Sequence, residues 1–109
     1  IGGIGSVDAA NWYTVGTDSN GITWSIDNDS VKKDDKKAVL DIKAMDYEGY
    51  HYIVTEEFNH KKREVKDVKV TLYNPKGEVV KQEQPNKSTR KVEQGTPAYA
   101  VYTLIWGDK

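Results

Sequence analysis

One stretch decides the fold of this 109-residue chain: residues 37–83 read KAVLDIKAMDYEGYHYIVTEEFNHKKREVKDVKVTLYNPKGEVVKQE. In three runs of this stretch the apolar side chains recur at every second residue, which places them on one face of a pleated β-strand. The alternating apolar residues are Ala38, Leu40, Ile42 and Ala44, then Tyr50, Tyr52, Val54 and Phe58, then Val68, Val70 and Leu72. Polar breaks at 46–49 and 60–63 separate the runs. The stretch therefore predicts a β-meander with one buried face.

The last hairpin of the meander has a clear turn signal. Pro75 suits the first central position of a type I turn, and Gly77 suits the left-handed position of the bulge that follows it. With Asn74 opposite Glu78, the expected pairs are Leu72 with Val80 on the inner face and Lys69 with Glu83 on the outer face. Val65 is out of phase with the apolar residues after it, which predicts a β-bulge near 66–67.

Shorter elements precede the meander. Strands are expected at 11–15 and 22–26, and the aromatic ring of Trp24 falls on the inner face. The polar segment 27–30 predicts an Asx-type or one-turn helical corner. The run at 32–37 mixes its charges, which is typical of a solvated loop.

A polar connection at 84–95 leads to an apolar C-terminal segment at 98–106. Thr96 is the expected N-cap of a helix, Pro97 its first residue and Gly107 its C-terminal cap. The composition of the segment would also allow a strand, but the capping residues favour a helix. Because this helix is almost entirely apolar, we expect part of it to stay exposed on the monomer and a homodimer to cover it.

These elements predict an α+β fold, in which an antiparallel five- to six-stranded β-meander sheet is packed by one C-terminal α-helix. The length allows a single domain. We expect a flexible N-terminal tail at 1–10 and one globular sheet-plus-helix domain at 11–107. The expected buried face consists of Trp24, Leu40, Ile42, Val54, Phe58, Val70 and Leu72, covered by Tyr102 and Ile105.

The composition limits the classes of protein. The 16 basic and 17 acidic residues give a formal net charge of −1, so no global charge points to specific nucleic acid binding. The absence of cysteine excludes disulfides, thiolate metal sites and cysteine catalysis. No apolar run approaches the roughly 20 residues of a transmembrane helix. No signal peptide is recognisable, so we expect either an intracellular protein or a chain that begins after a cleavage site.

No constellation of residues specifies a reaction, so we expect a protein without enzymatic activity or cofactor. His51 has outward parity and His60 lies in a basic turn, so neither is placed as a buried general base. Glu56 has inward parity, and two interpretations stay open: an acid or base with a raised pKa, or a strand-end residue that reaches solvent. The segment 27–38 lacks the glycine and the glutamate of a calcium loop, so no metal site is expected.

A small-ligand, haem-type binding protein is an alternative. Tyr47, Tyr50, His51 and Tyr52 surround one turn, and aromatic side chains with polar tips favour interfaces. The competing interpretation places Tyr50 and Tyr52 in the core and leaves Tyr47 and His51 isolated outside.

Several residues are spaced as in one protein family. They are Trp12-x-x-Val15, Asp18, Gly21, Ile26-Asp27-x-x-Ser30-Val31, Glu57-Phe58 followed by basic residues, Tyr73, Gly77 and Pro97. The pattern resembles the surface-adhesin protein E-like family of small, exported, often lipid-anchored bacterial proteins. The resemblance implies a sheet packed by a C-terminal helix, a place on the cell surface or in the periplasm, adhesion to a host extracellular protein, a lipid anchor outside this chain, and dimers. Many members carry a cysteine where this chain has His60, so the family's disulfide is absent.

Charge collects at one predicted end of the sheet. Short linkers make successive strands antiparallel, so alternate loops emerge at opposite ends. The loops 27–37, 60–63 and 84–95 then share a basic end. The candidate residues for binding an anionic partner are Lys32, Lys33, Lys61, Lys62, Arg63, Lys87, Arg90 and Lys91. We therefore predict a binding or adhesion module of the bacterial surface or periplasm whose basic loops contact an anionic surface.

Overall fold

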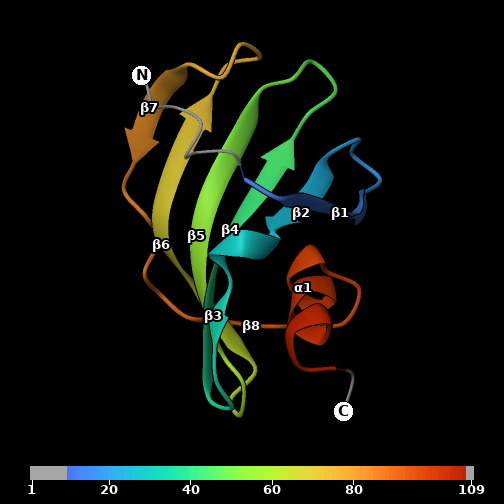
Figure 1. The fold of residues 1–109 in the computed structure, drawn as a ribbon, viewed down its shortest axis with the longest axis vertical. Helices are drawn as coiled ribbons and strands as arrows, with labels where there is room; N and C mark the ends of the chain where they lie inside the picture. Colours follow the sequence, from blue (N-terminus) through green and yellow to red (C-terminus); the bar gives the residue numbers. More distant parts are fainter. Residues whose placement is uncertain (1–9, 108–109) are drawn as a thin grey trace.

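Three hairpins placed side by side make up most of the sheet (Figure 1). The computed structural model describes residues 10–107, so the predicted tail at 1–10 lies outside them except for Ala10. The elements are β1 (Trp12–Thr17), β2 (Thr23–Asp27), the 3-10 turn η2 (Asn28–Ser30), β3 (Lys32–Lys33), β4 (Lys37–Met45), β5 (His51–Asn59), β6 (Glu64–Tyr73), β7 (Val79–Glu83), β8 (Arg90–Lys91) and α1 (Pro97–Trp106). The strand order is β1-β2-β4-β5-β6-β7, and these pairings are all antiparallel. The α+β class is confirmed.

The described residues form eight strands, more than the five or six predicted. The strand β3 pairs with the start of β4, so the run at 32–37 is a tight hairpin rather than only a solvated loop. The strand β8 pairs with the start of β6. Each of these strands has only two residues. Such short strands show no alternation of apolar residues, which is why the sequence pattern does not reveal them.

The turn between β6 and β7 has the expected geometry. Gly77 has a φ of 85°, and its N–H donates to the carbonyl oxygen of Asn74 at 2.9 Å. The side-chain oxygen of Asn74 accepts two backbone N–H groups of the turn. The turns at 18–21 and 46–49 repeat this pattern with aspartate in the first position. The corner after β2 is the predicted Asx-type turn, in which Asp27 accepts a backbone N–H of η2.

The core lies between α1 and the neighbouring part of the sheet. From the predicted set, the buried residues are Leu40, Ile42, Phe58, Val70, Tyr102 and Ile105. Trp24, Val54 and Leu72 are only half-buried. In Figure 1, α1 lies beside the lower part of the sheet and leaves the upper part of this face less covered. Trp24 nevertheless packs against the core and lines hollows together with residues of α1.

The helical interpretation of 98–106 is confirmed. The hydroxyl oxygen of Thr96 accepts the N–H of Tyr99 at 3.2 Å, and Pro97 is the first helical residue. At the other end, Gly107 has a φ of 89°, and its N–H donates to the carbonyl oxygen of Thr103 at 2.7 Å. A backbone N–H at the start of the helix and a backbone carbonyl at its end, which helix termini leave unpaired, therefore both have a hydrogen-bond partner.

A bulge in β6 lies slightly further along the chain than predicted. The register shifts opposite Thr55 and Glu56, so Val68 is the extra residue of β6. Val65 is therefore buried and Val68 is 42% exposed, which reverses the parity expected for Val68.

A second bulge makes the predicted register of β6 and β7 wrong. Leu72 pairs with Lys81 instead of Val80, and the expected pair of Lys69 with Glu83 does not form. Because Val80 is an extra residue in β7, every side chain after it changes face. Glu83 consequently lies on the same face as the helix, where it accepts a hydrogen bond from a tyrosine hydroxyl of β5.

Candidate anion-binding end of the sheet

Two of the predicted basic loops, 27–37 and 60–63, lie together at one end of the sheet, because successive strands are antiparallel. From the third loop, Arg90 and Lys91 pair with the start of β6. In Figure 1 the hairpin between β3 and β4 and the hairpin between β5 and β6 both point to the lower end. A hydrogen bond of 2.9 Å from the N–H of His60 to the carbonyl oxygen of Lys36 joins the two hairpins. The structure thus brings Lys61, Lys62 and Arg63 close to Lys36, a residue that the sequence-based site did not include.

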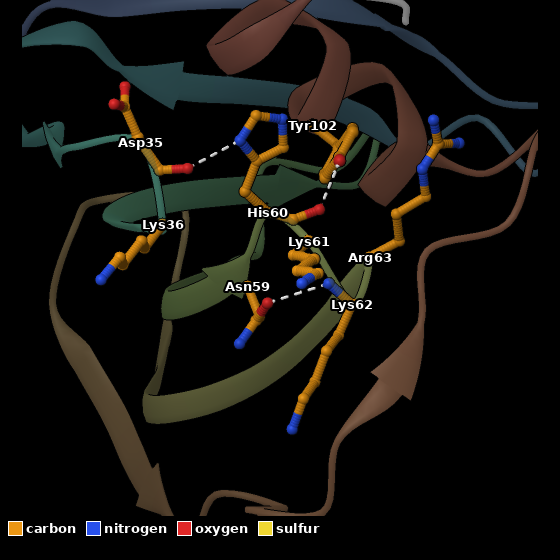
Figure 2. Close-up of a pocket in the computed structure, with 8 residues that line it drawn as sticks. All are labelled: Asp35, Lys36, Asn59, His60, Lys61, Lys62, Arg63 and Tyr102. Carbon is orange, nitrogen blue, oxygen red and sulfur yellow. Dashed lines mark hydrogen bonds between the residues drawn. The ribbon is translucent and has the colours of Figure 1, made fainter.

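A hollow of ≈ 660 Å³ lies between these hairpins (Figure 2). Its charged lining residues are Asp35, Lys36, Lys61, Lys62 and Arg63. Within residues 10–107, the ammonium groups of Lys36, Lys61 and Lys62 form no ion pair with a carboxylate. These three lysines are therefore available to an external anion.

The floor of the hollow is fixed by His60. The imidazole stacks on the indole of Trp106, with ring centroids 4.2 Å apart and an interplanar angle of 1°. Its Nδ1 hydrogen-bonds to the carbonyl oxygen of Asp35 at 2.8 Å. The hydroxyl of Tyr102 donates to the carbonyl oxygen of His60 at 2.7 Å. Because these contacts join the β3–β4 turn, the β5–β6 turn and α1, the base of the cationic hairpin is held against the helix.

Arg63 has an unusual backbone conformation. Its φ is 52°, and it is the only described residue other than glycine with a positive φ. This left-handed region disfavours residues that have a Cβ atom. The Arg63 guanidinium lies over the ring of Tyr102, 5.5 Å from the ring centroid. Arg63 therefore adopts a backbone conformation that favours glycine, and its guanidinium lies beside the helix.

Three other predicted binding residues are already engaged within the fold. The guanidinium of Arg90 binds Glu56 and Asp67. The ammonium of Lys91 pairs with Glu64 at 3.6 Å and donates to a carbonyl oxygen of the β5–β6 turn. The ammonium of Lys33 donates to the last turn of α1. The two remaining predicted residues, Lys32 and Lys87, are exposed.

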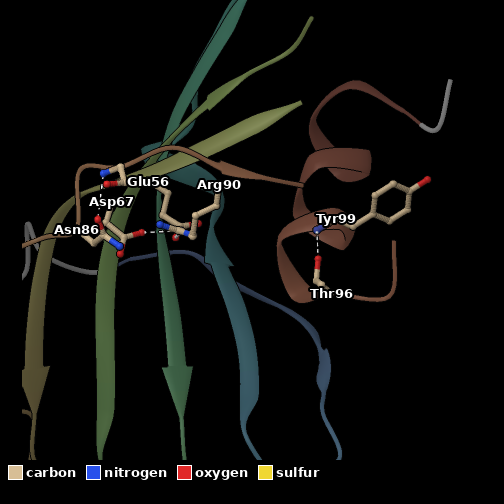
Figure 3. A network of polar contacts seen from close by, with 7 residues as sticks. Glu56, Asp67, Asn86, Arg90, Thr96 and Tyr99 are labelled. Carbon is tan, nitrogen blue, oxygen red and sulfur yellow. Dashed lines mark hydrogen bonds and ion pairs between the residues drawn. The ribbon is translucent and has the colours of Figure 1, made fainter. Parts of the chain in front are cut away.

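Glu56 does not reach solvent at a strand end, so that interpretation is wrong. Its side chain is 15% exposed in the middle of β5 and lies with Asp67 and Arg90 between the sheet and the segment before α1 (Figure 3). Burial raises the pKa of Glu56 from its ordinary value of 4.5 to about 8; the hydrogen bond and the charge of Asp67 act in the same direction, and Arg90 acts against them. Glu56 also lines a small hollow of ≈ 190 Å³ together with Trp24.

The aromatic residues around the β4–β5 turn do not line one cavity in the described part of the chain. Tyr47 is 89% exposed and Tyr50 is 44% exposed, so the expected inward position of Tyr50 is wrong. Tyr52 lies on the helix side of the sheet, where it donates to a carboxylate of β7. His51 lies on the opposite face and stacks on Tyr73, with centroids 5.2 Å apart. These four side chains therefore do not form the common cavity that a haem-type ligand would need.

Metal-ligating clusters, membrane helices and similar proteins give no further assignment of function. Among residues 10–107, no group of three or more histidine, cysteine, aspartate or glutamate residues could hold a metal ion. No helix in the same range has the length and apolar character needed to cross a membrane. The chain matches no protein-family model, no curated protein and no solved structure at a significant level. The resemblance to surface-adhesin protein E-like proteins stays a prediction.

Proposed function

We propose that this chain is a non-enzymatic binding or adhesion module of the bacterial cell surface or periplasm, and that the basic end of its sheet contacts anionic surfaces. The observation that carries the proposal is the hollow with Lys36, Lys61 and Lys62, which lack carboxylate partners among residues 10–107 and stand on a floor fixed by His60. A fixed floor lowers the entropy that must be lost when a partner binds.

The spread of the basic side chains favours an extended polyanion over one small anion. Figure 2 shows Lys36, Lys62 and Arg63 pointing in different directions rather than toward one point. A surface with many charges can meet all of them at once. Each lysine or arginine near an anionic membrane contributes about 1 kcal/mol, so the three unpaired lysines give roughly 3 kcal/mol. Such binding is weak and sensitive to salt.

Binding to heparin and to vesicles that contain phosphatidylglycerol, at low and at physiological salt, tests the proposal. The test variant combines Lys61→Glu with Lys62→Glu. The control combines Lys69→Glu with Lys76→Glu, which changes the formal charge equally at exposed positions outside the hollow. We expect the test variant alone to lose binding at physiological salt. Equal loss in both variants would assign the binding to net charge and reject the proposed end.

A small enzyme that uses Glu56 is the second candidate function. The observation that favours it is a buried carboxyl group whose pKa of about 8 keeps it protonated at neutral pH, beside Asp67 and the guanidinium of Arg90. A protonated carboxyl in such surroundings can serve as a general acid. Hydrolysis of chromogenic esters and glycosides by the wild type, lost in Glu56→Gln but kept in Glu57→Gln, would favour this candidate. No turnover by the wild type would count against it.

The location and the lipid anchor need a separate test. We propose export and a lipid anchor outside this chain on the resemblance to the adhesin family alone. The coding sequence upstream of Ile1 decides between the outcomes: a signal sequence that ends in a lipidated cysteine supports the anchor, and an upstream cytoplasmic domain would reject it.

A further inference from the structure

The outer side of α1 carries no charge. All ten residues of the helix, PAYAVYTLIW, are uncharged, whereas 30% of the whole chain is charged. Leu104 is 49% exposed on this helix, and Tyr13 of β1 is 50% exposed. A helix at the surface of a globular protein usually carries charged or polar residues on its outer face. The composition of this face therefore suits a partner that is partly apolar.

An apolar groove of ≈ 360 Å³ runs beside this part of the helix. Its apolar lining residues are Tyr13, Ile26, Val31, Leu104 and Ile105. The only charged residue among the described lining residues is Lys33. Its ammonium donates to the carbonyl oxygen of Ile105 at 2.7 Å, at the C-terminal end of the helix where a cation is favoured. The groove is thus apolar inside and positive at one border.

The groove adjoins the basic hollow. Trp106, the last residue of α1, stacks on His60 of the hollow, and its indole N–H donates to the carbonyl oxygen of Asp34 at 3.0 Å. Lys33 at the border of the groove lies in the same hairpin as Lys36 of the hollow. The apolar groove and the cationic hairpins therefore form neighbouring parts of one end of the molecule.

We propose that this end binds an anionic lipid bilayer, in which Leu104 and Tyr13 enter the interfacial region while Lys36, Lys61 and Lys62 meet the phosphate head groups. The inference rests on the proposed function and names its partner. Apolar and aromatic side chains flanked by lysine are the combination that holds proteins at a membrane interface. The three lysines contribute only electrostatic attraction, and the apolar side chains add the free energy of entering the membrane interface.

Charge complementarity favours a bilayer over a second copy of the chain at this surface. The two hairpins, 32–37 and 60–63, contain seven basic and two acidic residues. A two-fold interface places the same patch of both copies face to face, so it would bring two positive sets together. An anionic bilayer carries the opposite charge and offers an apolar interior to Leu104.

Sedimentation with phosphatidylglycerol vesicles at physiological salt tests the inference. The test variant is Leu104→Gln, and the control is Tyr47→Gln, which removes an exposed apolar ring outside the groove and the hollow. Partial burial of a leucine side chain in the membrane interface would raise the partition coefficient about tenfold. We expect Leu104→Gln to lower the partition by about that factor. Heparin has no apolar phase, so its binding should stay unchanged, and the control should match the wild type in both assays.

Two outcomes would overturn the inference in different ways. In the first outcome, Leu104→Gln binds vesicles as well as the wild type does, and the Lys61→Glu, Lys62→Glu variant does not bind. This result would show that Leu104 makes no contact with the bilayer, and it would leave the proposed function intact. A wild type that binds neither vesicles nor heparin would reject both. Light scattering on the same samples adds a third result: a dimer that becomes a monomer in Leu104→Gln would identify a second copy of the chain as the occupant.

Discussion

The guanidinium of Arg90 donates a hydrogen bond of 3.2 Å to the carboxyl group of Glu56, a residue 34 positions away in the sequence. The same nitrogen donates to Asp67 at 3.0 Å. Arg90 belongs to the segment that leads into α1, so this cluster fastens the connection between sheet and helix. Charges in the cluster should therefore control stability more than ligand binding.

The first prediction is that Glu56→Gln stabilises the protein at alkaline pH. The folded state raises the pKa of Glu56 from 4.5 to about 8, so it prefers the protonated form. The stabilising contribution is complete below pH 4.5 and is lost as the pH rises to 8. At about 1.4 kcal/mol per pKa unit, the loss is of the order of 3 to 5 kcal/mol. Urea unfolding between pH 5 and 9 should show this decline in the wild type and a flatter profile in Glu56→Gln.

The control for this prediction is Glu57→Gln, the same substitution at the neighbouring residue. Glu57 lies on the other face of the sheet, where it pairs with Lys37 and Lys66. We expect its pH profile to follow the wild type. A wild type whose stability does not fall between pH 5 and 9 would contradict the assignment of a raised pKa to Glu56.

The second prediction separates a structural cation from a binding one. Arg90→Ala removes hydrogen bonds to the carboxyl groups of Glu56 and Asp67 and should lower the free energy of unfolding by about 1 to 3 kcal/mol. Lys91→Ala, at the next position, breaks an exposed pair with Glu64 and an exposed hydrogen bond to the Lys62 carbonyl oxygen, and should lower it by less than about 1 kcal/mol. Thermal or urea unfolding measures both. Heparin binding should be unaffected by Arg90→Ala; a loss as large as that of Lys61→Glu with Lys62→Glu would place Arg90 in the binding surface after all.

The long strands could be predicted because their alternation is strong, and the positions of the bulges in β6 and β7 could not. The first predicted run, before the break at 46–49, matches β4 because Ala38, Leu40 and Ile42 all face the helix. In β7, Val79 and Val80 have equal apolar character, so parity does not tell which one faces inward. The register there depends on the extra residue Val80, which only the pairing with Leu72 reveals.

The candidate site was predictable at the level of loops and not at the level of side chains. Antiparallel topology alone places 60–63 beside 32–37. Which cations stay available depends on the carboxylates that face them. The sequence gives Glu56 an inward parity, but the shifted register of β6 is needed to bring Asp67 beside it and to draw Arg90 inward. Lys36 lies in the same run as the predicted Lys32 and Lys33, and only the hydrogen bond from His60 to its carbonyl oxygen shows that it lies beside 60–63.

The third prediction tests the assigned core. Leu40 is 1% exposed between the sheet and α1, so Leu40→Ala should cost about 2 to 5 kcal/mol through lost burial and the cavity it leaves. Val80→Ala serves as the control, because Val80 is 51% exposed and its loss should stay below about 0.5 kcal/mol. Urea unfolding measures both variants. Similar losses in the two would mean that the buried face has been assigned to the wrong parity.

The last prediction compares two substitutions at the turn between β5 and β6. Arg63 has a φ of 52°, a conformation that a residue with a Cβ atom adopts at a cost of about 1 to 2 kcal/mol and glycine adopts freely. Arg63→Ala and Arg63→Gly both remove the guanidinium from the ring of Tyr102, but only glycine relieves the backbone. We expect Arg63→Gly to be more stable than Arg63→Ala by about 1 kcal/mol in urea unfolding. The same comparison at Lys62, where the φ is not positive, should favour alanine, since glycine there only adds freedom to the unfolded chain. If Arg63→Ala proved as stable as Arg63→Gly, the turn would not hold Arg63 in the left-handed region in solution.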